Sequence, residues 1–272
     1  MTKKIKLNLC ARLAAIFYRT DHKKMSSLIF KQLELSKRYS ANYTTPLCIL
    51  ILSVYITHML KLRKPGIELA KIAYGLEKTF DKSPYKCQFL QIYYTFVQCW
   101  FQPIDSLLPS LKKAIQEGLI SGDRLYTEMG SNNLVSVVFL KGTSRDTHEK
   151  EIKKVSGIYE DTSSLREIPI LITEATMISL SQNKIISTEK YEKQIQAAKD
   201  YNLLASIYTK KALIYYHNKN CDSKIWARQA LERVKFQKGF FYQSKITFGT
   251  HLFSTAHFTK KRGLIKKHYP YL

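Results

Sequence analysis

The stretch that decides the fold runs from Pro84 to Tyr126 and reads PYKCQFLQIYYTFVQCWFQP, then IDSLLPSLKKAIQEGLISGDRLY. A proline can open a helix because its missing N–H would be unpaired in the first turn anyway. From Lys86 to Phe101 the segment is apolar on nearly every side. A helix of this kind must be covered by neighbours on more than one side. We therefore expect an inner helix here, ended by Pro103.

The second half of the stretch predicts an outer, amphipathic helix. Its apolar residues share one stripe at helical spacing: Leu107, Leu108, Leu111, Ala114, Ile115 and Leu119. Gly118 and Gly122 are expected to end this helix, and Asp123 to cap the next one. An inner helix, a turn, an outer helix and a glycine stop together make one helical hairpin.

The same pattern recurs along the chain. Helix pairs are predicted to begin near residues 45, 84, 123, 164, 202 and 239, at offsets of about 37 to 41 residues, somewhat longer than the roughly 34 of the tetratricopeptide consensus. The sequence therefore predicts an all-α fold, a right-handed solenoid of antiparallel helical hairpins that is tetratricopeptide-like. We expect residues 1–44 to form N-terminal helices that pack on or cap the solenoid. Residues 45–258 would be the repeat domain and residues 259–272 a basic tail.

Hydrophobic periodicity predicts the individual helices outside the quoted stretch. They cover residues 8–18, 22–39, 46–62, 67–80, 123–140, 148–159, 170–180, 188–199, 202–217, 223–237 and 240–258. Asn42 or Thr45 can cap the helix that starts at Pro46, and Lys64-Pro65-Gly66 is expected to be a break. Helix 67–80 carries an apolar stripe made of Leu69, Ile72, Ala73, Leu76 and Phe80.

The charge of the chain is strongly positive, with 44 Lys and Arg against 21 Asp and Glu and a net charge of +23. Such a balance is typical of binding to nucleic acid, anionic lipid or an acidic protein, but it also fits a generally basic surface without a polyanion ligand. The basic residues are spread over many segments, whereas a dedicated groove concentrates them on one element. Lysines along one concave stripe would favour a polyanion, and lysines on every outer helix would favour the general surface.

Motifs that would carry chemistry are missing from the sequence. The five cysteines have no CxxC spacing, which indicates buried reduced thiols. His251, His257 and His268 are 6 and 11 residues apart, so no two of them share a helix face at the spacing of a metal site. The longest apolar run, Leu47 to Leu60, is shorter than the ~20 residues of a membrane span. We expect a cytoplasmic protein without transmembrane segment, cofactor, metal or enzymatic activity.

One run of residues carries a resemblance to a known family. Two elements carry it: Cys99-Trp100-Phe101-Gln102-Pro103 and, further along, Gly122-Asp123-Arg124-Leu125-Tyr126. They resemble the helical-repeat region of large bacterial signalling proteins, in which a Trp-x-x-Pro element precedes a helix ending in Gly-Asp-x-x-Tyr. Those proteins join a kinase-like domain, a P-loop ATPase domain, tetratricopeptide-like repeats and often a histidine kinase. Segments 69–74, 205–216 and 226–230 fit in the same order. The chain has no P-loop and no kinase motif, so the resemblance implies the scaffold without its enzymatic domains.

These observations favour a non-catalytic scaffold for protein–protein interaction, in signalling or regulation, whose concave surface binds a protein or peptide segment, an acidic one above all. A nucleic-acid-binding helical protein is the alternative from another class, and a degenerate remnant of a larger signalling ATPase is a third. The possible binding surface consists of Tyr93, Trp100, Lys190, Lys193, Lys210 and Lys211. Aromatic side chains would supply affinity there, and lysines on the rim would speed association.

Overall fold

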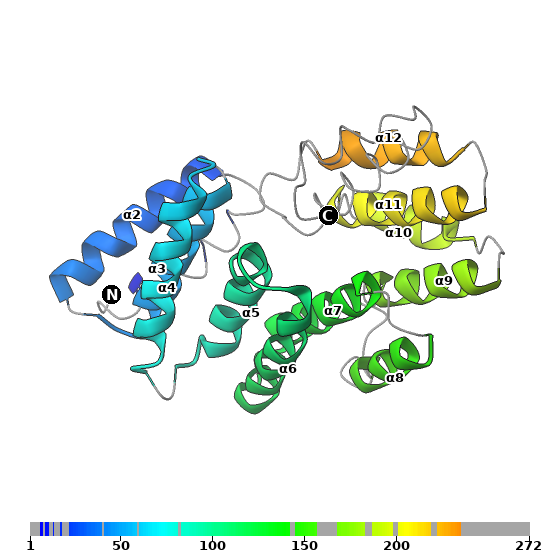
Figure 1. Cartoon of the computed structure of the whole chain (residues 1–272). Helices are drawn as coiled ribbons and strands as arrows, with labels where there is room; N and C mark the ends of the chain where they lie inside the picture. The colour runs from blue at the N-terminus through cyan, green and yellow to red at the C-terminus, as the bar shows by residue number, and fades with distance from the viewer. Residues whose placement is uncertain are drawn as a thin grey trace. The chain divides into compact units, whose positions relative to one another are not determined.

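The computed structural model describes about seven tenths of the chain in detail. The described residues are 6–7, 9–10, 13, 17, 22–39, 41–58, 60–80, 83–141, 145–156, 168–182, 187–197, 201–218 and 222–234. Within them all regular structure is helical, which confirms the predicted all-α class (Figure 1). The chain divides into two compact units, Met1–Leu134 and Val135–Leu272, and the boundary lies inside the predicted repeat domain.

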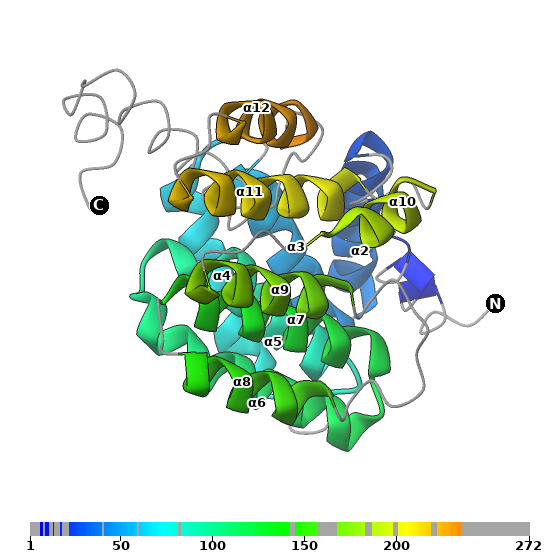
Figure 2. The same ribbon diagram turned by 90° about the vertical axis from the view of Figure 1, so that its right-hand side faces the viewer.

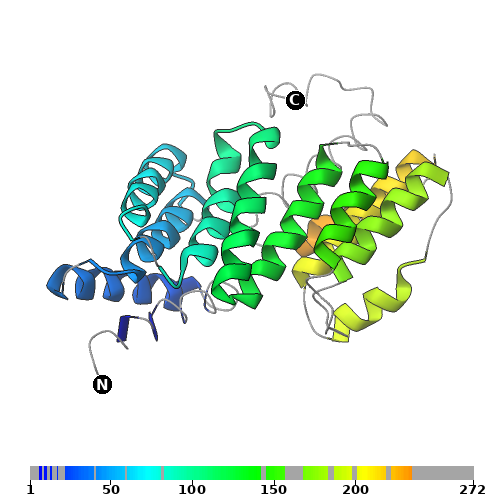
Figure 3. The same ribbon diagram turned by 90° about the horizontal axis from the view of Figure 1, so that it is seen from below.

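Unit 1 contains consecutive helices that pack against their neighbours in sequence. Its helices are α2 (His22–Tyr39), α3 (Thr44–His58), α4 (Arg63–Glu77), α5 (Lys86–Phe96), the 3₁₀ turn η1 (Gln98–Trp100), α6 (Ile104–Ser121) and α7 (Arg124–Leu140), whose last turns belong to unit 2. Helix α3 packs against α2, α4 and α5, and α5 packs against α6 (Figure 3).

Unit 2 continues the series with five further helices among the described residues. They are α8 (Arg145–Ser156), α9 (Ile168–Gln182), α10 (Glu189–Ala197), α11 (Tyr201–His217) and α12 (Ser223–Val234). Helix α11 lies against α9, α10 and α12, and α11 and α12 run side by side (Figure 2). Their shared core consists of Ile172, Ile195, Leu204, Ile207, Tyr208 and Ala230, with Tyr191 and Trp226 packed against it.

Apolar and amphipathic helices alternate along the chain. In α3, ten of fifteen residues are buried, and in α5 nine of eleven. In α4 only four of fifteen residues are buried, and in α10 two of nine. The buried residues of α4 are Gly66, Ala70, Ala73 and Glu77, which form a single stripe at helical spacing. Helices of the first kind need cover on several sides, and helices of the second kind supply it.

Two of the expected helix caps are present. Asn42 Oδ1 accepts the backbone N–H of Thr44 at 2.9 Å, and the Thr45 hydroxyl accepts the N–H of Asn42 at 3.0 Å, so both expected residues help to start α3. Asp123 Oδ1 accepts the N–H of Tyr126 at 3.2 Å at the start of α7. Gly122, with φ of +69°, ends α6 in the left-handed conformation that glycine adopts without strain.

Gly118 does not end α6, contrary to the prediction. It lies within the helix and is buried, and a Cβ built there would meet the Thr127 hydroxyl at 2.1 Å and Cys87 Sγ at 2.6 Å. The glycine is therefore needed for close packing of α6 on α5 and α7. The helix continues to Ser121 because only Gly122 takes the positive φ.

Several predicted helix limits in the first half of the chain were wrong. The inner helix α5 ends at Phe96, five residues before Phe101, and a 3₁₀ turn fills the interval. Helix α4 starts at Arg63, so Lys64-Pro65-Gly66 is its first turn and not a break. Proline fits there because N–H groups of the first turn have no partner within the helix.

The predicted inward stripe of α4 was also wrong in part. Ile72 is 62% exposed, whereas Ala70 and Glu77 are buried. Helices α2, α7, α11 and α12 begin within about one residue of their predicted starts. The predicted final helix 240–258, the tail 259–272 and most of helix 8–18 lie outside the described residues.

A pair of glycines on α4 offers a test of close helix packing. A Cβ at Gly66 would lie 1.9 Å from Thr57 Oγ1 and 2.9 Å from the Ser53 carbonyl oxygen of α3. We expect Gly66→Ala to lower the free energy of unfolding by about 1 to 3 kcal/mol, because the two helices must separate. Gly75 has nothing within 4 Å of its Cβ position. Gly75→Ala should therefore raise stability by about 0.5 to 1 kcal/mol.

Urea unfolding followed by circular dichroism measures both variants. Equal effects of the two substitutions, in either direction, would contradict the close approach of α4 to α3.

Candidate functional site

Of the two aromatic residues predicted for the binding surface, Tyr93 is buried in unit 1. Tyr93 is 7% exposed, and its ring stacks on Tyr74 with centroids 4.5 Å apart and on Phe89 with centroids 6.3 Å apart. Burial and the neighbouring Tyr74 raise the pKa of Tyr93 to about 12. Tyr93 thus belongs to the packing of unit 1. The backbone of Trp100 lies in the 3₁₀ turn η1, and its side chain is outside the described part of the structure.

The four predicted lysines fall into two classes. Lys190 and Lys193 lie three residues apart on α10, and both are exposed. Lys210 and Lys211 lie on α11, where Lys210 is only 8% exposed and the side chain of Lys211 is 12% exposed. Only the first pair can present charge to a partner at the surface.

Lys210 is a buried amine. Its Nζ donates a hydrogen bond to the Thr173 hydroxyl of α9. Burial is the cause that lowers the pKa of Lys210 to about 7, since a charged ammonium loses its hydration there. The burial of Lys210 could have been predicted from the sequence. Lys210 stands three residues after Ile207 and four before Ile214, both buried, so it shares their inward stripe.

Lys211 connects three helices of unit 2. Its Nζ lies 2.5 Å from Glu192 Oε1 of α10 and 3.9 Å from the ring centre of Trp226 of α12. The same carboxylate oxygen accepts a hydrogen bond from the Thr188 hydroxyl at 2.7 Å. An ammonium between a carboxylate and an aromatic face is a favourable arrangement at a partly buried position. The cluster therefore joins α10, α11 and α12.

Glu77 of unit 1 is a second buried ionisable group, and the sequence analysis missed it. The residue is 4% exposed, and neither carboxyl oxygen has a hydrogen-bond partner. Burial raises the pKa of Glu77 to about 7; Lys86 opposes this shift and Glu117 adds to it. Lys86 and Glu117 form an ion pair of 3.1 Å beside it. Glu77 could have been found as the last member of the stripe that starts at Gly66.

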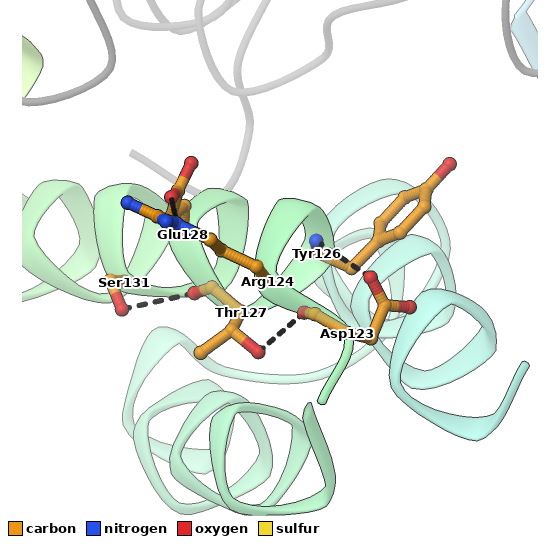
Figure 4. Close-up of polar contacts among 6 residues, drawn as sticks. All are labelled: Asp123, Arg124, Tyr126, Thr127, Glu128 and Ser131. Carbon is orange, nitrogen blue, oxygen red and sulfur yellow. Dashed lines mark hydrogen bonds and ion pairs between the residues drawn. The ribbon is translucent and has the colours of Figure 1, made fainter. Parts of the chain in front are cut away.

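The residues of the Gly-Asp-x-x-Tyr element at the start of α7 make hydrogen bonds and an ion pair within the protein (Figure 4). Besides the cap of Asp123, the Thr127 hydroxyl donates to the Asp123 carbonyl at 2.7 Å. Arg124 Nε lies 2.9 Å from Glu128 Oε1, and the Glu128 side chain is 1% exposed. The Tyr126 hydroxyl accepts the Gln88 amide of α5 at 2.8 Å. The element therefore starts α7 and connects it to α5.

The described ranges contain neither a metal-binding cluster nor a membrane-spanning helix. No three His, Cys, Asp or Glu residues of that part come together as metal ligands. None of the helices described there is both long and apolar enough to cross a membrane. His251, His257 and His268 lie outside the described residues.

The buried lysine predicts an unusual dependence of stability on pH. Between pH 7 and 10.5 the unfolded chain binds a proton at Lys210 that the folded chain does not. The stability of the native protein should therefore rise with pH in this window, by up to about 1.4 kcal/mol per pH unit from this group. Lys210→Met removes the cost of deprotonating this amine on folding. The variant should therefore be more stable than the native protein at pH 7, and the difference should disappear towards pH 10.5.

Thermal unfolding at several pH values measures the effect of Lys210→Met. Lys193→Met, at an exposed position of α10, is the matched control and should change little. A gain that is the same at all pH values would contradict the assignment.

Glu77 predicts the opposite dependence. Between its usual pKa of 4.5 and about 7 the folded chain holds a proton that the unfolded chain has released, so native stability falls as the pH rises. Glu77→Gln keeps the shape without the charge. The stability of this variant relative to the native chain should increase by up to about 3 kcal/mol from pH 4.5 to 7 and stay constant above pH 7.

Urea unfolding from pH 4 to pH 8 measures this difference. Glu68→Gln is the control on the same helix, because Glu68 forms only an exposed ion pair with Lys71. If both variants follow one pH profile, Glu77 is not the buried acid.

No protein-family model matches the chain, and neither a curated protein nor a solved structure is similar to it at a significant level.

Proposed function

We propose that the chain is a non-catalytic helical-repeat scaffold that binds a segment of another protein. In this proposal the alternating helices are hairpins of a right-handed, tetratricopeptide-like solenoid. Helices α3, α5, α7, α9 and α11 are its inner members, and α2, α4, α6, α8, α10 and α12 are its outer members. The regular change from apolar to amphipathic helices along the chain supports this assignment.

The observation that carries the proposal is the distribution of the basic residues. Exposed Lys or Arg residues stand on every proposed outer helix; examples are Lys37, Arg38, Lys64, Lys71, Lys112, Lys113, Lys150, Lys153, Lys190, Lys193, Lys224 and Arg228. Among the proposed inner helices, α3 and α9 contain no Lys or Arg, and α5 and α7 carry one each, Lys86 and Arg124, in the first turn. The two lysines of α11 are turned into contacts with neighbouring helices. This pattern is expected of solvated outer faces and not of a groove for a polyanion.

Polar contacts within and between the helices also support a scaffold. Lys210 binds Thr173, Lys211 binds Glu192, and Arg124 binds Glu128. Each of these contacts fixes a helix or joins two helices. The resemblance of the Trp100–Pro103 and Gly122–Tyr126 elements to repeat regions of bacterial signalling proteins is the reason that we propose a role in signalling or regulation.

Charge selects the class of partner. With a net charge of +23, the chain attracts acidic segments at long range, and such steering raises the rate of association. Apolar contacts would then supply the affinity that remains when salt screens the charges.

The test compares three labelled probes: an acidic peptide with regularly spaced leucines, a duplex DNA and a single-stranded RNA. Fluorescence anisotropy is recorded from low to about 0.2 M salt. We expect the peptide to stay bound at the highest salt, because apolar burial is not screened, and both nucleic acids to be released.

Lys190→Gln/Lys193→Gln is the matched variant for the contribution of exposed charge, and it should weaken all three probes alike. Nucleic acid binding that persists at about 0.15 M salt, with log affinity falling steeply against log salt, would replace the scaffold by a nucleic-acid-binding function.

A further inference from the structure

The corner between α6 and α7 exposes three large apolar side chains. Leu119 is 59% exposed, Ile120 75% and Leu125 45%. Ile120 is the most exposed large apolar side chain in the described part of the chain. Gly122 reverses the chain between them, so the end of α6 and the start of α7 present these residues at the same corner. Several apolar side chains within a polar rim are typical of an interaction site, whereas single ones are normal on any surface.

The acidic groups near this corner are all engaged. Glu117 pairs with Lys86 of α5 at 3.1 Å. Asp123 caps α7 through the N–H of Tyr126. Glu128 is buried against Arg124. Of these three residues only Glu128 is fully buried, at 1% exposure, whereas the Glu117 side chain is 24% exposed in its ion pair.

The basic groups near the corner are on the outside. Lys112 and Lys113 are exposed on α6, about two turns before Leu119 and Ile120. The Arg124 side chain is 53% exposed at the start of α7. Because Arg124 is paired with Glu128, the positive charge that the rim presents is that of Lys112 and Lys113. The corner therefore combines an apolar centre with two exposed lysines on the same helix.

These observations select one occupant. A second copy of the chain carries the same net charge of +23, and the chain's own segment 260–267 contains five Lys and Arg and no acid. Like charges oppose both contacts. We propose that the α6–α7 corner, defined by Leu119, Ile120 and Leu125, docks an amphipathic acidic segment of another protein. This inference rests on the proposed scaffold function and names the site that such a partner uses.

In the docked state the apolar side of the partner covers Ile120 and its neighbours, and its acidic residues face Lys112 and Lys113. The two parts of the contact respond to salt in different ways. Burial of the isoleucine is insensitive to salt, whereas attraction to the lysines is screened. A substitution at Ile120 and a substitution at a lysine can therefore test the apolar and the electrostatic contributions separately.

The experiment uses the full chain and two labelled peptides of about 20 residues with identical Glu, Gln and Leu content. In one peptide the leucines have helical spacing, and in the other their order is scrambled. The native chain should bind the first peptide more tightly. Ile120→Ser should weaken this binding about tenfold without changing its salt dependence, and Lys113→Gln should weaken it a few-fold and flatten the salt dependence.

Ile225→Ser is the matched control. Ile225 is 52% exposed on α12 and stands between the exposed Lys224 and Arg228, but it has no exposed apolar neighbour of its own in the same turn. This variant should bind like the native chain. Circular dichroism and thermal unfolding show that the variants are folded.

Three results would overturn the inference. The peptides could bind equally, Ile120→Ser could bind like the native chain, or Ile120→Ser and Ile225→Ser could lose the same affinity. The second result leaves the scaffold function intact, because the native chain still binds the peptide. The scaffold function itself fails on a different readout, the persistence of nucleic acid binding at moderate salt.

Discussion

The structure depends on covering helices that carry almost no charge. Helices α3 and α5 bury most of their residues and cannot be stable with one face in water. Their neighbours approach closely because glycines stand at the crossings: Gly66 lies against Thr57, and Gly118 lies against Cys87 and Thr127. The outer helices then need only one buried stripe each, and their remaining faces can carry the large positive charge of the chain.

Much of the fold follows from periodicity and capping in the sequence. The starts of α2, α7 and α11 and the cap at Asp123 were predicted because apolar spacing and an N-cap residue act locally. The stripe of α4 was not predicted correctly, since Leu69, Ile72 and Leu76 have the same spacing as Ala70, Ala73 and Glu77. At Gly66 helix α3 approaches too closely for a side chain, and this contact selects the side of α4 that carries Gly66, Ala70 and Ala73. A contact with a distant segment decides this, and local pattern does not contain it.

The candidate site shows the same limit. Lys190 and Lys193 were expected at the surface and are exposed there. Lys210 and Lys211 were predicted from their charge, but their position on α11 turns them towards α9, α10 and α12. Sequence gives the chemical type of a side chain, whereas its exposure depends on which helices pack around it. Leu119 was predicted to belong to the apolar stripe of α6, but it lies in the last turn of the helix and is 59% exposed.

The reactivity of the two buried thiols of unit 1 reports how often the helices around them separate. Burial raises the pKa of Cys48 in α3 and of Cys87 in α5 to about 12, so almost no thiolate is present at neutral pH. A thiol reagent attacks the thiolate and needs access to it. Labelling at either cysteine therefore has to wait until its helix separates from its neighbours. The rates at the two positions thus measure, without any introduced probe, how often each inner helix is released from the packing that surrounds it.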